Sequence, residues 1–202
     1  MNKMLLSSAL VLSVMSGSAM ATVTTGQLTF NWQAVVPSAP VTSTAWAFVD
    51  GRDIPFVPTT EQLRVTKTST GIQAVSVTPY DFFIVPVTGD VVDGKPVTRA
   101  AQTVSLKNPV NVYLASSPVS NGLVGNKQLA LSTVAKASDG QIAININGNP
   151  LKVGSLASTT IGALNDKDEH IDIDMNASIA KADFADGASI SFVAPVVFAV
   201  DI

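Results

Sequence analysis

Both ends of the chain carry its strongest conformational signal, which is an apolar side chain at every second position. The stretch GQLTFNWQAVV near the N-terminus has apolar residues at Leu28, Phe30, Trp32, Ala34 and Val36. The chain closes on a second such stretch, GASISFVAPVVFAVDI, with apolar residues at Ile190, Phe192, Ala194, Val196, Phe198, Val200 and Ile202. An extended segment with this period has one apolar face and one polar face. The pattern therefore predicts a long amphipathic strand at each end.

The residues between these strands indicate an all-β fold. Apolar alternation recurs in short stretches separated by turn dipeptides, and no run of ten residues shows a convincing helical period. Candidate strands are 62–68, 72–78, 81–87, 96–106, 110–115, 127–134 and 170–179. The clearest hairpin is QIAININGNPLKVG, where Asn147-Gly148 supplies a two-residue turn between alternating segments. Asp93-Gly94 predicts a second turn, and the strand spacing suits a sandwich.

The first 21 residues have the organisation of a secretion signal. Lys3 provides a positive charge, an apolar core follows from Leu5 to Met15, and small residues end at Ala21. The apolar core is shorter than the roughly 20 residues that span a membrane. We therefore expect residues 1–21 to be a signal peptide, and residues 22–202 to be exported as one domain.

Composition removes several classes of function. The formal net charge is −3, which argues against a nucleic-acid partner. The chain has no Cys, so neither disulfides nor thiol chemistry is available. Its single His and the absence of a GxSxG motif limit catalytic options. We expect no enzyme and no cofactor.

One segment is dense in groups that could bind a metal ion. Its members are Asp166, Asp168, Glu169, His170, Asp172 and Asp174. The segment lacks the central Gly of the twelve-residue calcium loop. Apolar Ile171, Ile173 and Met175 alternate with the charged residues, which favours a solvated strand face. We therefore predict no metal site.

Pro195 interrupts the closing strand on its polar side. Because proline has no N–H, it favours an edge strand or a bulge. A long open edge is an aggregation hazard that proteins cover or use to join subunits.

The two ends resemble the pilin subunits of chaperone/usher fimbriae in Gram-negative bacteria. Those subunits carry, after a signal peptide, a run of the form G-x-(Val/Leu)-x-Phe-x-Gly-x-Val-Val. This chain matches it at Gly26, Leu28, Phe30, Val35 and Val36. It departs from it where Trp32-Gln33 stands in place of a single Gly. The Cys pair of the commonest branch is missing, and Asp201 replaces a penultimate Tyr.

The resemblance implies an immunoglobulin-like β-sandwich that lacks its last strand and is completed by donor-strand exchange. Residues 22–36 would then form the N-terminal donor segment running into the first strand, and residues 37–202 the sandwich domain. Donor residues would be Gly26, Leu28, Phe30 and Trp32. The acceptor groove would be lined by Ile190, Phe192, Val196, Phe198 and Val200. By similarity, a periplasmic chaperone fills this groove until an outer-membrane usher replaces it with the donor strand of the next identical or related subunit. The product would be a fimbrial shaft at the cell surface that supports adhesion.

The same residues allow two other interpretations. The N-terminal stripe could be an ordinary first strand that pairs within its own sandwich. Alternatively, the chain could be a secreted or periplasmic sugar-binding sandwich, with Trp46 and Tyr80 as aromatic platforms.

Overall fold

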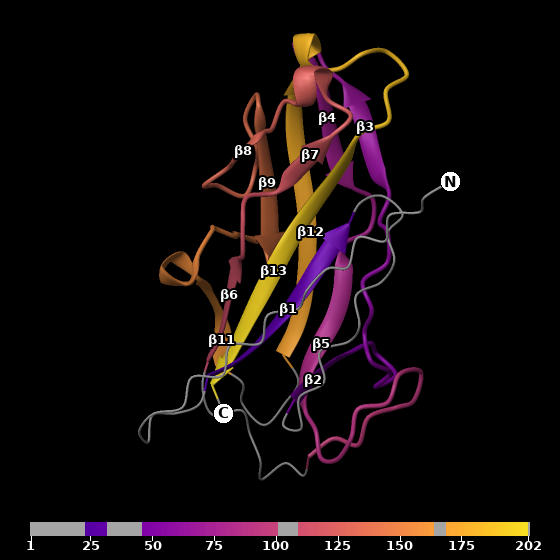
Figure 1. Cartoon of the computed structure of the whole chain (residues 1–202), viewed down its shortest axis with the longest axis vertical. Helices are drawn as coiled ribbons and strands as arrows, with labels where there is room; N and C mark the ends of the chain where they lie inside the picture. Colours follow the sequence, from indigo (N-terminus) through magenta and orange to yellow (C-terminus); the bar gives the residue numbers. More distant parts are fainter. Residues whose placement is uncertain (1–22, 32–45, 101–108, 164–168, 202) are drawn as a thin grey trace, which may run out of the picture.

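Two packed β-sheets make up the part of the molecule that the structure describes (Figure 1). The structure is a computed structural model that describes residues 23–31, 46–100, 109–163 and 169–201. Within these residues there is no α-helix, and only three short 3-10 turns occur: η1 (Val124–Asn126), η2 (Ser155–Ala157) and η3 (Lys181–Asp183). This architecture confirms the predicted all-β sandwich. The described residues also include no helix long and apolar enough to cross a membrane.

The smaller sheet has five strands and contains both terminal strands of the described chain. Its order is β1 (Val23–Asn31), β13 (Ser191–Asp201), β6 (Pro109–Leu114) and β11 (Thr159–Ala163). The short β7 (Val119–Asn121) also pairs with β13. In Figure 1 the indigo β1 and the yellow β13 run side by side across the front of β12.

The larger sheet has eight strands arranged around one long strand, β12 (Glu169–Ala180). One edge of β12 pairs with β9 (Gln141–Ile146), which is followed by β10 (Asn149–Pro150). The other edge pairs first with β5 (Tyr80–Pro86) and then with β4 (Gly71–Ser76). Beyond these lie β2 (Trp46–Val49) and β3 (Leu63–Lys67). The remaining strand, β8 (Ala130–Leu131), pairs with β9 and makes the one parallel pairing among the described strands.

The core lies between the two sheets and follows the alternation of the sequence. Ile171, Ile173 and Met175 of β12 are fully buried, while His170 is exposed and Asp172 and Asp174 are half-buried. This confirms the predicted inner and outer faces of this strand. The predicted hairpin is also present, because Asn147 and Gly148 have φ values of 47° and 76°, as a two-residue turn requires.

Two strand predictions are wrong over the residues that the structure describes. Of residues 127–134, only the two residues of β8 form a strand, because side chains take over the pairing. The Gln128 amide bonds the backbone N–H and C=O of Ser120, at 2.8 and 2.9 Å. The Ser132 hydroxyl bonds the backbone of Val134. The predicted strand 96–106 makes only one isolated bridge, at Arg99, before it leaves the described residues after Ala100.

Candidate functional site

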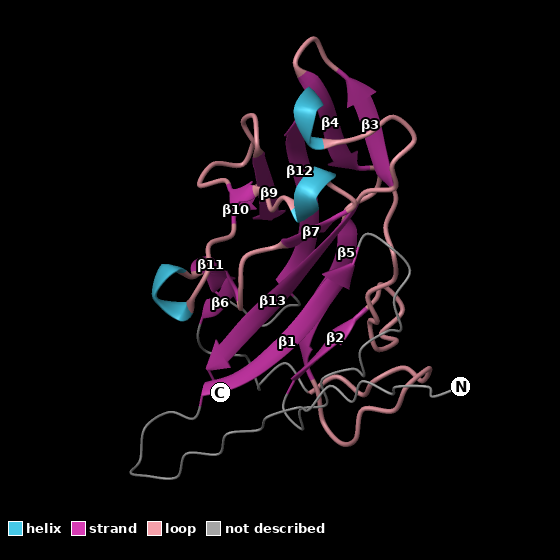
Figure 2. Cartoon of the chain, turned by 45° about the horizontal axis from the view of Figure 1, so that its top comes forward, coloured by secondary structure: helices cyan, strands magenta, loops and turns pink. Residues whose placement is uncertain are grey.

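The pairing of β1 with β13 joins the two ends of the described chain. The strands are antiparallel over nine residue pairs, from Val23 opposite Asp201 to Asn31 opposite Val193. Among the described strands, β1 pairs with β13 alone. The strand therefore sits at a sheet edge and can be removed without breaking any other described pairing. Figure 2 shows β1 and β13 in the layer that faces the viewer.

Four of the five residues predicted to line the groove lie on the inner face of β13, and the fifth, Ile190, directly precedes the strand. Phe192, Val196, Phe198 and Val200 are completely buried, and Ile190 is partly buried against the same core. Ala194, which belongs to the same alternation, is also completely buried. The sequence pattern already placed Ala194 on this face, although the groove prediction did not include it.

Three of the four predicted donor residues lie opposite these groove residues. Gly26 pairs with Phe198, Leu28 with Val196, and Phe30 with Ala194. Because directly opposed residues occupy the same face of a sheet, these donor positions lie on the core-facing side. The fourth, Trp32, lies outside the described residues.

Pro195 is placed so that it does not interrupt the edge that β1 occupies. Its carbonyl oxygen accepts a hydrogen bond from the N–H of Ala115, on the opposite side from β1. The N–H and C=O of one strand residue point to the same neighbour, so the missing N–H also faces away from β1. On that far side, the partner of β13 changes from β7 to β6 across this residue. Pro195 was predicted to mark an edge or a bulge, but here it marks a change of partner strand within the sheet.

A cluster of aromatic rings packs beneath β13 around Phe198. The ring of Phe198 meets those of Phe48 and Phe82 edge to face, with centroid separations of 4.9 and 6.0 Å. Phe56 stacks on Phe82 at 4.4 Å, and Trp46 meets Phe48 at 5.1 Å. Such pairs contribute about 0.5–1.5 kcal/mol each beyond the burial of their area.

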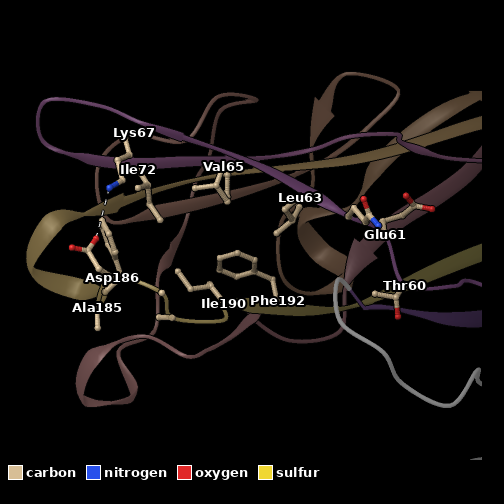
Figure 3. Close-up of a pocket in the computed structure, with 15 residues that line it drawn as sticks. Thr60, Glu61, Leu63, Val65, Lys67, Ile72, Ala185, Asp186, Ile190 and Phe192 are labelled. Atoms are coloured by element: carbon tan, nitrogen blue, oxygen red, sulfur yellow. Dashed lines mark ion pairs between the residues drawn. The ribbon is translucent and has the colours of Figure 1, made fainter.

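A cavity of about 750 Å³ opens beside the N-terminal end of β13, next to the point where the pairing with β1 stops. Ile190 and Phe192 form one wall, and Leu63 and Val65 of β3 lie across from them (Figure 3). Lys67 and Asp186 stand at one end with their charged groups 3.8 Å apart. No motif signalled this cavity, because β3 and the segment before β13 are far apart in the sequence.

Of the charged segment considered for metal binding, Asp166 and Asp168 lie outside the described residues. Its other members, from Glu169 to Asp174, lie on β12. No group of three potential ligands that could hold a metal ion is found there. His170 instead pairs with Asp81 of the neighbouring strand, with Nε2 and Oδ1 separated by 2.6 Å. Burial raises the pKa of Asp172, and the neighbouring carboxylates of Asp174 and Asp81 raise it further.

The two aromatic residues that the sugar-binding hypothesis requires at the surface are not there. Trp46 is completely buried and Tyr80 is 3% exposed, so neither ring can stack on a sugar. Tyr80 uses its hydroxyl within the fold, donating to the carbonyl oxygen of Thr59 at 2.6 Å.

Comparison with known proteins places these features in context. The chain is 60% identical to the CS5 fimbrial subunit of Escherichia coli over 201 residues, which cover 98% of each chain. No protein-family model matches the chain, and no solved structure does.

Proposed function

Because the chain belongs to the family of the CS5 fimbrial subunit, we propose that it builds a fimbrial shaft by lending β1 to the β13 edge of the next copy. As a fimbrial subunit it is a structural protein and not an enzyme, and it polymerises with other subunits into a surface fimbrium.

The observation that carries the proposal is the β1–β13 ladder. Since β1 pairs only with β13 among the described strands, a β1 strand from another copy could make the same nine residue pairs. Such a contact joins the N-terminal strand of one copy to the C-terminal strand of another. It is head to tail and does not close on itself, so repetition produces a filament.

The expected strength of the joint follows from the side chains brought to the core. Burial of an apolar side chain of the size of Leu or Phe contributes about 1.5–3 kcal/mol. Leu28 and Phe30 alone would therefore contribute about 3–6 kcal/mol before ordering costs. On the receiving side, an empty groove would expose the completely buried Val196, Phe198 and Val200.

A subunit without a strand in this position needs temporary cover. Its free edge would be β13, a strand of eleven residues with an apolar inner face. Edges of this kind template aggregation. We therefore assign the cover to a periplasmic chaperone, which an outer-membrane usher would exchange for the β1 strand of the incoming subunit.

Expression of residues 22–202 with and without residues 22–36 tests the proposal. We expect the shortened chain to aggregate alone, to be rescued by a matching periplasmic chaperone, and to take up a synthetic peptide of residues 22–36 without polymerising. A peptide carrying Leu28→Asp is the matched control and should not be taken up. A stable monomer from the shortened chain, with an unchanged melting temperature, would refute strand exchange.

A further inference from the structure

An asparagine followed by a glycine occurs twice in the chain, each time where a strand ends. The two pairs are Asn121-Gly122, at the end of β7, and Asn147-Gly148, in the turn between β9 and β10. All four residues are exposed. Because glycine has no side chain to shield its backbone nitrogen, that nitrogen can approach the side-chain amide carbon of the preceding asparagine.

The fold holds the side-chain amide of Asn147 at both of its polar atoms. Nδ2 donates to the carbonyl oxygen of His170 at 3.1 Å, and Oδ1 accepts from the N–H of Asp172 at 2.8 Å. Both partners belong to β12, the long strand at the centre of the larger sheet. Rotation of this amide toward the nitrogen of Gly148 therefore breaks both hydrogen bonds.

The side-chain amide of Asn121 has no such restraint. Among the residues that the structure describes, it makes no hydrogen bond. Its backbone lies opposite Ser191 at the start of β13, on the edge of that strand that β1 does not use. The amide can therefore rotate toward the nitrogen of Gly122 without losing a described contact.

The fold requires a glycine at position 122. Its φ is 83°, in a region that residues with a side chain rarely adopt. A Cβ added to Gly122 would also lie 1.9 Å from the carbonyl oxygen of Ser189. The next residue, Leu123, is buried in the core. A reactive pair of residues is thus fixed between the β7–β13 pairing and a core side chain.

We propose that Asn121 is a site of spontaneous deamidation, which slowly converts it to isoaspartate and aspartate and loosens β7 from β13. The Gly122 nitrogen loses its proton to a base in solution and attacks Cγ of Asn121. The Cγ–Nδ2 bond breaks, the leaving nitrogen takes up a proton and departs as ammonia, and a succinimide ring remains. Water then opens the ring. Cleavage at the main-chain carbonyl carbon gives isoaspartate, and cleavage at Cγ gives aspartate.

Isoaspartate would change the backbone as well as the charge. It routes the main chain through the side-chain carbons and so lengthens the path from residue 121 to Gly122. The pairing of Asn121 with Ser191 and the burial of Leu123 would then no longer fit the same length of backbone. The close approach of Gly122 to Ser189 leaves no slack for the difference. We therefore expect β7 to lose its pairing while the β1–β13 ladder, on the opposite edge, remains.

Ageing of assembled fimbriae at mildly alkaline pH tests the site, with peptide mapping that separates asparagine, aspartate and isoaspartate. We expect acid to form at Asn121, and at Asn147 at least about fivefold more slowly, because two hydrogen bonds hold that amide. In the urea-unfolded chain both should convert at similar rates, since both precede glycine. An intact Asn121 under conditions that convert the unfolded chain would overturn the proposal. Equal rates in the folded protein would overturn the protection assigned to β12.

Asn121→Gln is the matched variant, because attack on its longer side chain has to close a larger and less favourable ring. The variant should form no acid at this position. Hydrogen exchange before and after ageing then measures the effect on β7. Aged wild type should lose protection in β7 and keep it in β1, and the aged variant should keep both. Full protection of β7 in converted wild type, or the same loss in the aged variant, would overturn the loosening of β7 by deamidation.

Discussion

Replacement of Phe198 by Ala should remove a large contribution of β13 to the sandwich. The ring is completely buried and meets the rings of Phe48 and Phe82 at 4.9 and 6.0 Å. Truncation of a buried Phe to Ala costs about 3–5 kcal/mol, which includes the cavity left behind. Because Phe198 has two edge-to-face partners, we expect a loss of about 4 kcal/mol in the free energy of unfolding.

This loss is large compared with the roughly 5–15 kcal/mol that stabilises a typical domain. For a chain of this size, about 1 kcal/mol corresponds to a change of about 2–4 °C in melting temperature, so Phe198→Ala should melt about 8–16 °C lower. Urea unfolding of residues 22–202, followed by circular dichroism, measures the free energy directly. The experiment is made with β1 present, because Gly26 of β1 lies opposite Phe198.

Val193→Ala on the same strand is the matched control. Val193 is half-buried on the outer face of β13, so its truncation should cost less than about 1.5 kcal/mol. Phe198→Leu should restore part of the stability, because it refills most of the space. A loss of under about 1.5 kcal/mol for Phe198→Ala would refute the assignment of this face as the core of the sandwich.

Three further changes test other parts of the structure, each by urea unfolding. Gly71→Ala should destabilise the protein by more than about 1 kcal/mol, because the added Cβ would lie 2.0 Å from the carbonyl oxygen of Ile179. Lys127→Ala should cost about 1–3 kcal/mol, because the amino group lies 2.7 Å from the Asp183 carboxylate, which is 11% exposed and would lose this partner. Asp172→Asn should raise stability at pH 7. Since burial raises the pKa of Asp172 above 3.8 in the folded state, its ionisation makes the wild type less stable as pH rises through that range.

Controls for these variants come from the same chain. Gly51→Ala should be nearly neutral, because no atom lies within 4 Å of its added Cβ. Lys67→Ala should cost at most about 1 kcal/mol, because its partner Asp186 is 92% exposed. If Asp172→Asn left the difference in stability between pH 3 and pH 7 unchanged, the assigned effect of burial on this carboxyl would be wrong.

Features that depend on neighbouring residues were predicted correctly, and features that depend on contacts between distant residues were not. The inner face of β13 and the turn at Asn147-Gly148 were predicted correctly, because alternation and turn chemistry are properties of neighbouring residues. The strand predicted at 127–134 failed, because the side chain of Gln128 bonds Ser120, a contact that alternation does not reveal. The hypothesis that Trp46 binds sugar was wrong for a similar reason. Whether this side chain is exposed depends on how the two sheets pack over it, which the local sequence does not show.

The sequence by itself determined that both ends form amphipathic strands and which face of each is apolar. Backbone geometry turns a period of two residues into two faces without reference to the rest of the chain. Only the tertiary structure decided that β1 lies on β13, that the pairing ends at Asn31, and that a cavity lined by Phe192 and Leu63 follows. These facts depend on the relative placement of two sheets, which results from packing between residues far apart in the sequence.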